Sequence, residues 1–236
     1  MKFPLPLEPG VLIRRYKRFL ADVELPDGQV ITAHCPNSGT MKTVSDPGSP
    51  VWISRSDNPK RKLAYTLELI CCGPDRVPAL VNTARTNHVV RHAIDHGLVP
   101  ELRGYGQLKT EVKIGESRLD IVLRDGPESA PECFIEVKNV TMSQDPGLAI
   151  FPDAVTKRGR KHLGELMRLV DQGHRAVQFF CVSRADAQSM APAEAIDPDY
   201  ARTLREAAAA GVEVLAYRAH ITTAEMVLSE RIRIEL

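Results

Sequence analysis

The sequence predicts a mixed α+β protein, in which a small β-barrel precedes an α/β domain with a mixed sheet flanked by helices. Two observations support this prediction. Up to about Asn82 the chain contains short strand signals separated by Gly/Pro turns and little that looks helical. From Thr83 onward, helical periodicity alternates with apolar strand segments. We therefore predict two domains, residues 1–82 and residues 83–236.

Six segments of the first domain have the composition of short strands. The clearest is the alternation of Phe19, Ala21, Val23 and Leu25 with polar residues. The others are residues 11–15, 29–35, 50–54, 65–72 and 77–82. Such a series predicts a small antiparallel barrel. An OB-like barrel is the first choice because its exposed face and loops often bind nucleic acid, but other small barrels fit almost as well.

The second domain is predicted from the order of its elements. A helix near Thr86 is followed by strands at residues 109–114, 117–123 and 134–140. A helix from near Asp153, a buried strand at 175–182, a helix closed by Gly211 and a strand at 212–217 come next. Thr222 and Glu225 predict a capping box for a short last helix, and residues 231–236 an edge segment. The main order is α-β-β-β-α-β-α-β.

This order brings three carboxylates and a lysine together. Glu136 and Lys138 lie two residues apart on one strand, so their side chains share a face. A two-residue hairpin link at positions 115–116 places Glu111 opposite Asp120, where like charges repel each other. A cation would relieve this repulsion, and oxygen ligands suit Mg²⁺ or Mn²⁺. The predicted metal ligands are Asp120, Glu136 and Glu111, with Lys138 as the fourth catalytic residue; the alternative is a lattice of surface salt bridges.

The spacing of Asp120 and Glu136-Val137-Lys138 resembles the D…(D/E)-x-K signature of the PD-(D/E)xK nuclease-like superfamily. The predicted order of helices and strands is also that of the superfamily core. The resemblance implies a hydrolytic role for these residues. Asp120 and Glu136 would hold the metal, aided by the carbonyl of Val137, and Lys138 would orient or acidify the attacking water. Glu111 would then be a ligand of a second metal or of water.

Positive charge is clustered, although the net charge of the 236 residues is only +1. Three basic runs are present, and together they favour a phosphate-binding surface over three solvated faces. The candidate nucleic-acid-binding residues are Arg14, Arg15, Lys17, Arg18, Lys60, Arg61, Lys62, Lys157, Arg158 and Lys161.

The rest of the composition narrows the class of protein. The chain has no apolar run near the roughly 18 residues that a membrane span needs, so we expect a cytoplasmic protein with no membrane partner. Five cysteines without a C-x-x-C motif argue against disulfides and a zinc ribbon. His88, His92 and His96 recur every four residues, which indicates either a metal-binding face or, as we prefer, an exposed helix flank.

Over its whole length the chain resembles the sugar fermentation stimulation protein family of prokaryotes. The matching segments are residues 15–23, 34–41, 58–63, 65–68, 81–83, 136–140, 151–156 and 158–163. The resemblance implies an OB-like domain, a nuclease-like domain, binding of double-stranded DNA with little sequence preference, and regulation of sugar (maltose) metabolism. Two hypotheses follow: a non-catalytic DNA-binding regulator, and a metal-dependent nuclease acting on DNA or RNA.

Overall fold

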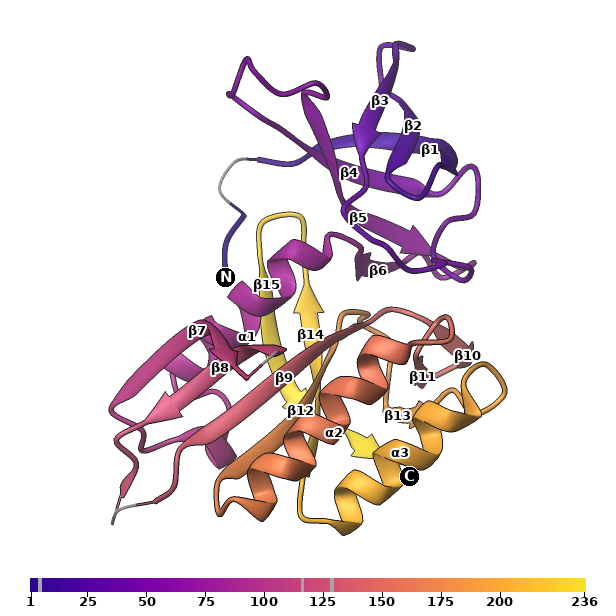
Figure 1. Cartoon of the computed structure of the whole chain (residues 1–236). Coiled ribbons are helices and arrows are strands. Elements are labelled where there is room, and N and C mark those ends of the chain that lie inside the picture. Colours follow the sequence, from indigo (N-terminus) through magenta and orange to yellow (C-terminus); the bar gives the residue numbers. More distant parts are fainter. Residues whose placement is uncertain (4–5, 116, 128–129) are drawn as a thin grey trace.

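The computed structural model describes residues 1–3, 6–115, 117–127 and 130–236. Its N-terminal part is a β-barrel (Figure 1). The strands are β1 (Glu8–Tyr16), β2 (Leu20–Glu24), β3 (Val30–His34), β4 (Pro50–Arg55), β5 (Tyr65–Cys72) and β6 (Val77–Leu80). Their order is β3-β2-β1-β4-β5-β6, and a parallel pairing of β3 with β5 closes the first five into a barrel. This arrangement confirms the OB-like prediction.

Alternation of side chains explains why these segments form a closed barrel. Leu12, Val23 and Ile53 point inward from three strands and are buried in one apolar cluster. Their neighbours in sequence face outward, as the period of two requires. The barrel core is therefore a cluster of its own, whereas Leu69 of β5 and Leu80 of β6 pack into one of the two apolar clusters of the second part of the chain.

The second part is built on a six-stranded mixed sheet of order β15-β14-β12-β9-β8-β7. The strands are β7 (Gln107–Ile114), β8 (Ser117–Arg124), β9 (Cys133–Val140), β12 (Arg175–Val182), β14 (Glu213–Ile221) and β15 (Met226–Arg231). The helices are α1 (Thr86–Asp95), α2 (Lys157–Asp171) and α3 (Pro198–Ala209), with short 3₁₀ turns η1 (Thr83–Arg85) and η2 (Pro100–Leu102). Strands β9, β12 and β14 are parallel, and the predicted mixed sheet with flanking helices is confirmed.

The two faces of this sheet bury different helices, and this decides where Glu136 points. Ile135 and Val137 of β9 belong to the cluster that contains the apolar residues of α1. Phe134 belongs to the cluster that contains Leu163 and Leu166 of α2. Because side chains alternate along a strand, Glu136 and Lys138 share the α2 side with Phe134.

A third, small sheet was not predicted. Its order is β10-β11-β13-β16, formed by β10 (Ser143–Asp145), β11 (Leu148–Phe151), β13 (Ser189–Pro192) and β16 (Arg233–Ile234). Each strand has two to four residues, too few to show a period of two. Strand β11 leads into the loop that precedes α2, so this sheet positions one wall of the site.

Two predictions about helices need correction. Helix α2 begins at Lys157 and not near Asp153, because the Thr156 side chain accepts a hydrogen bond from Gly159 N at 3.0 Å and caps it. The prediction of a short last helix is wrong. Thr222 N donates to Glu225 O at 2.9 Å, and this turn leads directly into β15. Within the described residues, no helix is long and apolar enough to span a membrane.

Glu68 fixes the barrel on the second part of the chain. It is 1% exposed and lies in β5. Arg85 of η1 donates to both of its oxygens, at 2.5 and 2.7 Å, and Asn82 donates at 2.8 Å. A buried, bidentate ion pair at the junction holds the two parts in one orientation. The loops of the barrel therefore have a defined position over the sheet.

Candidate nuclease-like site at the domain junction

The site begins where β8 and β9 separate. Their paired residues end at Ile121 and Ile135. Beyond this point β8 and β9 no longer pair through their backbones. Instead, the side chain of Asp120 accepts a hydrogen bond from Val137 N through Oδ2, at 2.8 Å. Its Oδ1 accepts from Asn87 Nδ2 of α1 at 2.7 Å. The carboxylate is thus held on two sides at the edge of the opening between the strands.

Glu136 is the most buried charged group of the site, with 2% of its surface exposed. Its Oε1 accepts hydrogen bonds from Lys138 Nζ at 2.6 Å and from His162 Nδ1. Its Oε2 is buried and has no hydrogen-bond partner among the described residues. An unpaired buried carboxylate oxygen is costly, so its lone pairs are available to a cation.

The hydrogen-bond partners of His162 indicate which of its ring nitrogens is the donor. Arg158 Nε lies 3.3 Å from His162 Nε2, and a guanidinium can only donate. Nε2 is therefore the acceptor, and Nδ1 carries the proton that it donates to Glu136. Both residues come from the first two turns of α2, so this helix positions Glu136 from above the sheet.

The pKa values of the two carboxyl groups move in opposite directions. Burial, and then the nearby charge of Glu136, raise the pKa of Asp120 to about 6. Burial also opposes ionisation of Glu136, but the hydrogen bond from His162 and the charge of Lys138 outweigh it and lower the pKa of Glu136. One acid is therefore held ionised while the pKa of its neighbour lies nearer to neutrality, a pattern that is frequent at functional sites.

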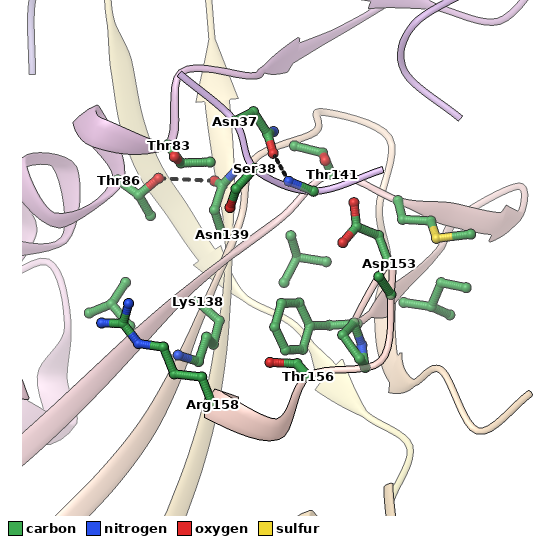
Figure 2. Close-up of a pocket in the computed structure, with 18 of the residues that line it drawn as sticks. Asn37, Ser38, Thr83, Thr86, Lys138, Asn139, Thr141, Asp153, Thr156 and Arg158 are labelled. Atoms are coloured by element: carbon green, nitrogen blue, oxygen red, sulfur yellow. Dashed lines mark hydrogen bonds between the residues drawn. The ribbon is translucent and has the colours of Figure 1, made fainter. Parts of the chain in front are cut away.

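Both carboxylates line a cavity of about 500 Å³ between the barrel and the sheet. Figure 2 shows Asn37 and Ser38 of the barrel facing Asn139, with Thr86 on one side and Asp153 on the other. The walls are rich in uncharged polar side chains. A polar cavity of this size suits a ligand with many hydrogen-bonding groups.

The roof of the cavity is the barrel loop, residues 36–41, which is attached at both ends. At one end Thr83 Oγ1 donates to Pro36 O at 2.6 Å. At the other end Met41 N donates to Asp153 Oδ2 at 3.2 Å. A Cβ atom at Gly39 would lie 2.3 Å from that carboxylate oxygen, so only glycine allows the approach. The barrel loop thus bridges the opening above Glu136.

Glu111 does not join the other two acids, and the predicted cluster of three is corrected. The hairpin register is as predicted on both sides, with Thr110 opposite Ile121 and Val112 opposite Leu119. The backbone of Glu111 itself is left-handed, with φ of 56°. Its side chain is 55% exposed and pairs with Arg118 at 3.7 Å. Position 116, in the predicted hairpin link, lies outside the described residues.

The basic candidates divide into three groups. Arg18 and Arg158 line the cavity, from the barrel and from α2. Arg14 pairs with Asp22, Arg61 donates to Thr66, and Arg15 donates to the carbonyls of residues 37, 39 and 40. These three support the fold, and Arg15 in particular holds the barrel loop. The remaining five are exposed and lie outside the cavity wall: Lys17, Lys60, Lys62, Lys157 and Lys161.

Three contributors to the site were missed from the sequence: His162, Asn87 and the barrel loop. His162 directly follows the basic residues 157–161, and the sequence gives no sign that its ring faces Glu136. The contact of Thr40 with Asp153 joins residues 113 positions apart. One signal was present, because the resemblance to the family included residues 34–41, 151–156 and 158–163, the segments that meet here.

The residues at the site fit a hard divalent cation. Mg²⁺ is usually bound by one or two carboxylates and several waters. The free Oε2 of Glu136 and the Asp120 carboxylate provide such a donor set, next to Lys138. The described part of the chain contains no group of three or more His, Cys, Asp or Glu residues placed to hold a metal ion, so the donor set here is the two carboxylates. His88, His92 and His96 are accordingly not such a group. The rings of His92 and His96 stack, with their centroids 4.0 Å apart.

The fold and site define a class of protein in which an OB barrel precedes a restriction endonuclease-like domain. Comparison with known families agrees. Residues 13–81 match the SfsA N-terminal OB domain, and residues 84–225 match the sugar fermentation stimulation protein RE domain. The chain belongs to the sugar fermentation stimulation protein family, which confirms the resemblance seen in the sequence.

Relatives match over nearly the whole chain. A sugar fermentation stimulation protein homolog of Geobacter metallireducens is 53% identical over 238 residues and is covered completely, as is this chain. The homolog of Geotalea uraniireducens is 55% identical over 94% of both chains. The structure of Pyrococcus furiosus SfsA in complex with Ca²⁺ is 27% identical, with a TM-score of 0.89 over 100% of this chain and 98% of that one.

Proposed function

We propose that this protein binds DNA with little sequence preference and hydrolyses phosphodiester bonds with Mg²⁺ or Mn²⁺ at the cavity between its domains. The observation that carries the proposal is the buried Oε2 of Glu136, which has no partner among the described residues and lies beside Asp120 and Lys138. The relative from Pyrococcus furiosus, described in complex with Ca²⁺, supports a divalent ion in this family.

Each residue has a defined task in this proposal. Asp120 and Glu136 would hold the metal, which supplies a polarised phosphate and an activated water when bound. Lys138, held at 2.6 Å from Glu136, places a positive charge where the attacking water and the scissile phosphate meet. Arg158 and Arg18 contribute charge to the cavity wall, where the flanking phosphates would bind. His162 keeps Glu136 in position through Oε1 and leaves Oε2 for the metal.

The test is cleavage of DNA by the purified protein with Mg²⁺ or Mn²⁺, compared with EDTA. Glu136→Gln should lower the cleavage rate by about 100-fold or more, because it removes a metal ligand worth several kcal/mol of transition-state stabilisation. Binding of DNA should change little. Glu111→Gln is the matched control, since its exposed side chain lies outside the cavity, and this variant should cleave like the wild type. Equal rates for Glu136→Gln and wild type would refute the proposal.

The relatives are named for the stimulation of sugar fermentation. The second candidate is therefore a regulator of sugar metabolism, with maltose as the proposed sugar, that binds DNA and does not cleave it. Both candidates require DNA binding, and they differ in whether Glu136 is needed. In a strain that lacks the gene, wild type and Glu136→Gln would restore growth on maltose equally if regulation alone matters. Loss of rescue in Glu136→Gln, with DNA binding intact, would instead assign the phenotype to cleavage.

A further inference from the structure

An aromatic pair lies at the surface of the barrel, formed by Phe19 in the turn that precedes β2 and by His34 at the end of β3. Phe19 is 44% exposed, an unusual position for a phenylalanine. Its ring lies beside that of His34, with centroids 6.4 Å apart and an angle of 33° between the planes. Phe19 O accepts a hydrogen bond from Cys35 N at 2.8 Å, so the two segments are joined at this point.

Both members of this pair are close in sequence to residues that line the cavity. Arg18, next to Phe19 in sequence, lines the cavity, and Asn37, three residues after His34, is part of its roof. Lys17 and Arg18 both have left-handed backbones, with φ of 47° and 64°. Such backbone strain at consecutive non-glycine residues costs stability, and it often marks a functional segment. Here it directs Arg18 to the cavity wall and leaves Phe19 on the surface.

The charged groups at the floor of the cavity are largely buried, which favours a single strand over intact duplex DNA as the substrate. Glu136 is 2% exposed, and the side chain of Lys138 is 16% exposed. The barrel loop bridges the opening above them, attached to Thr83 and to Asp153. A volume of about 500 Å³ is that of a site for one small ligand, comparable to pockets that receive a single unstacked nucleotide.

We propose that the substrate is single-stranded DNA, with one nucleotide in the cavity and a neighbouring base stacked on the Phe19 and His34 pair. The inference rests on the proposed function and specifies its substrate class. Stacking on an aromatic platform accepts every base, in agreement with weak sequence preference. Arg18 lies between the platform and the cavity and neutralises the connecting phosphate. The polar wall residues, Asn37 and Thr86 among them, contact the enclosed nucleotide.

The experiment measures binding and cleavage separately. Fluorescence anisotropy with Ca²⁺ compares a labelled single strand with a blunt duplex of the same sequence and length. The single strand should bind at least about tenfold more tightly, and Phe19→Ala should weaken its binding by about tenfold, the loss of one stacked base. Phe19→Trp should retain it. Val30→Ala is the matched control: Val30 is 57% exposed and lies at the opposite end of β3, about 13 Å from His34.

The outcomes separate this inference from the proposed function. Tighter binding of the duplex, or equal effects of Phe19→Ala and Val30→Ala on the single strand, would overturn the inference. Cleavage of duplex DNA without cleavage of single strands would also overturn it, while leaving the metal-dependent nuclease in place. Single-strand binding that depends on Phe19, in a protein that cleaves no DNA with Mn²⁺, would support the strand inference and refute cleavage.

Discussion

Replacing Asp120 by Asn should stabilise the metal-free protein and remove its response to divalent cations. The pKa of Asp120 is raised to about 6, first by burial and then by the charge of Glu136. A carboxyl pKa that is higher in the folded than in the unfolded state means that ionisation destabilises the folded state. This destabilisation is fully present above the pKa of the folded state. The shift of about two units corresponds to about 3 kcal/mol at neutral pH. Asn keeps the shape but loses about 1–2 kcal/mol of hydrogen bonding, because it replaces a charged acceptor. A net gain of about 1–2 kcal/mol remains.

The assay is thermal unfolding at neutral pH, in EDTA and in millimolar Mn²⁺. In EDTA the melting temperature of Asp120→Asn should exceed that of wild type by about 2–8 °C, since 1 kcal/mol corresponds to about 2–4 °C for a chain of this size. Mn²⁺ at 100 times its dissociation constant should stabilise wild type by about 2.7 kcal/mol. It should leave Asp120→Asn unchanged. A metal response that survives in Asp120→Asn, or a variant less stable than wild type in EDTA, would refute this account of the site.

Two further predictions concern charges away from the carboxylates. Lys60→Ala with Lys62→Ala, both exposed, should weaken binding to all DNA sequences alike and reduce the salt slope of log affinity by about 1.4–1.8, because each phosphate contact contributes about 0.7–0.9. A double variant on β7, Lys109→Ala with Lys113→Ala, is the control, and equal slopes for both would contradict the assignment. Asp186→Asn should destabilise the fold by about 3 kcal/mol at neutral pH, because Asp186 holds the buried Arg184 at 2.6 and 2.7 Å. Burial opposes the hydrogen bonds from Arg184, yet the pKa of Asp186 is lowered, so this stability is present above about pH 4 and is lost as pH falls further. Melting curves from neutral to acidic pH should therefore converge for the two proteins.

The parts of the fold that follow a regular period could be predicted from the sequence. The barrel strands, and which side chains of β9 share a face, follow from the alternation of side chains alone. The 2.6 Å contact of Lys138 with Glu136 is a direct consequence of that alternation. The strands of the small sheet could not be predicted, because β10, β11 and β13 have at most four residues and gain stability from neighbours distant in sequence. Local propensity carries little information about such segments.

The error at Glu111 has a more specific cause. The hairpin register was right, and the ladder continues on both sides of the position. A left-handed backbone at a single glutamate moves its side chain away from Asp120 to Arg118. Propensity gives no warning of this, because non-glycine residues other than Asn, Asp and His rarely adopt that conformation. A pattern of charges therefore predicts which strands carry a site more reliably than which side chains enter it.

The role of Arg15 shows the same limit and connects the two domains. Because Arg15 belongs to a basic run, we expected it to contact phosphate. Its guanidinium instead donates to three carbonyls of the barrel loop, at 3.1, 2.8 and 2.9 Å. Those hydrogen bonds hold the loop in place together with Met41, which is 2% exposed and packs in the barrel core. The ordered loop then reaches Asp153, next to the start of α2, the helix that supplies Arg158 and His162. The position of Glu136 is thus set from one domain and the access to it from the other, so the barrel belongs to the nuclease-like site as much as the sheet does.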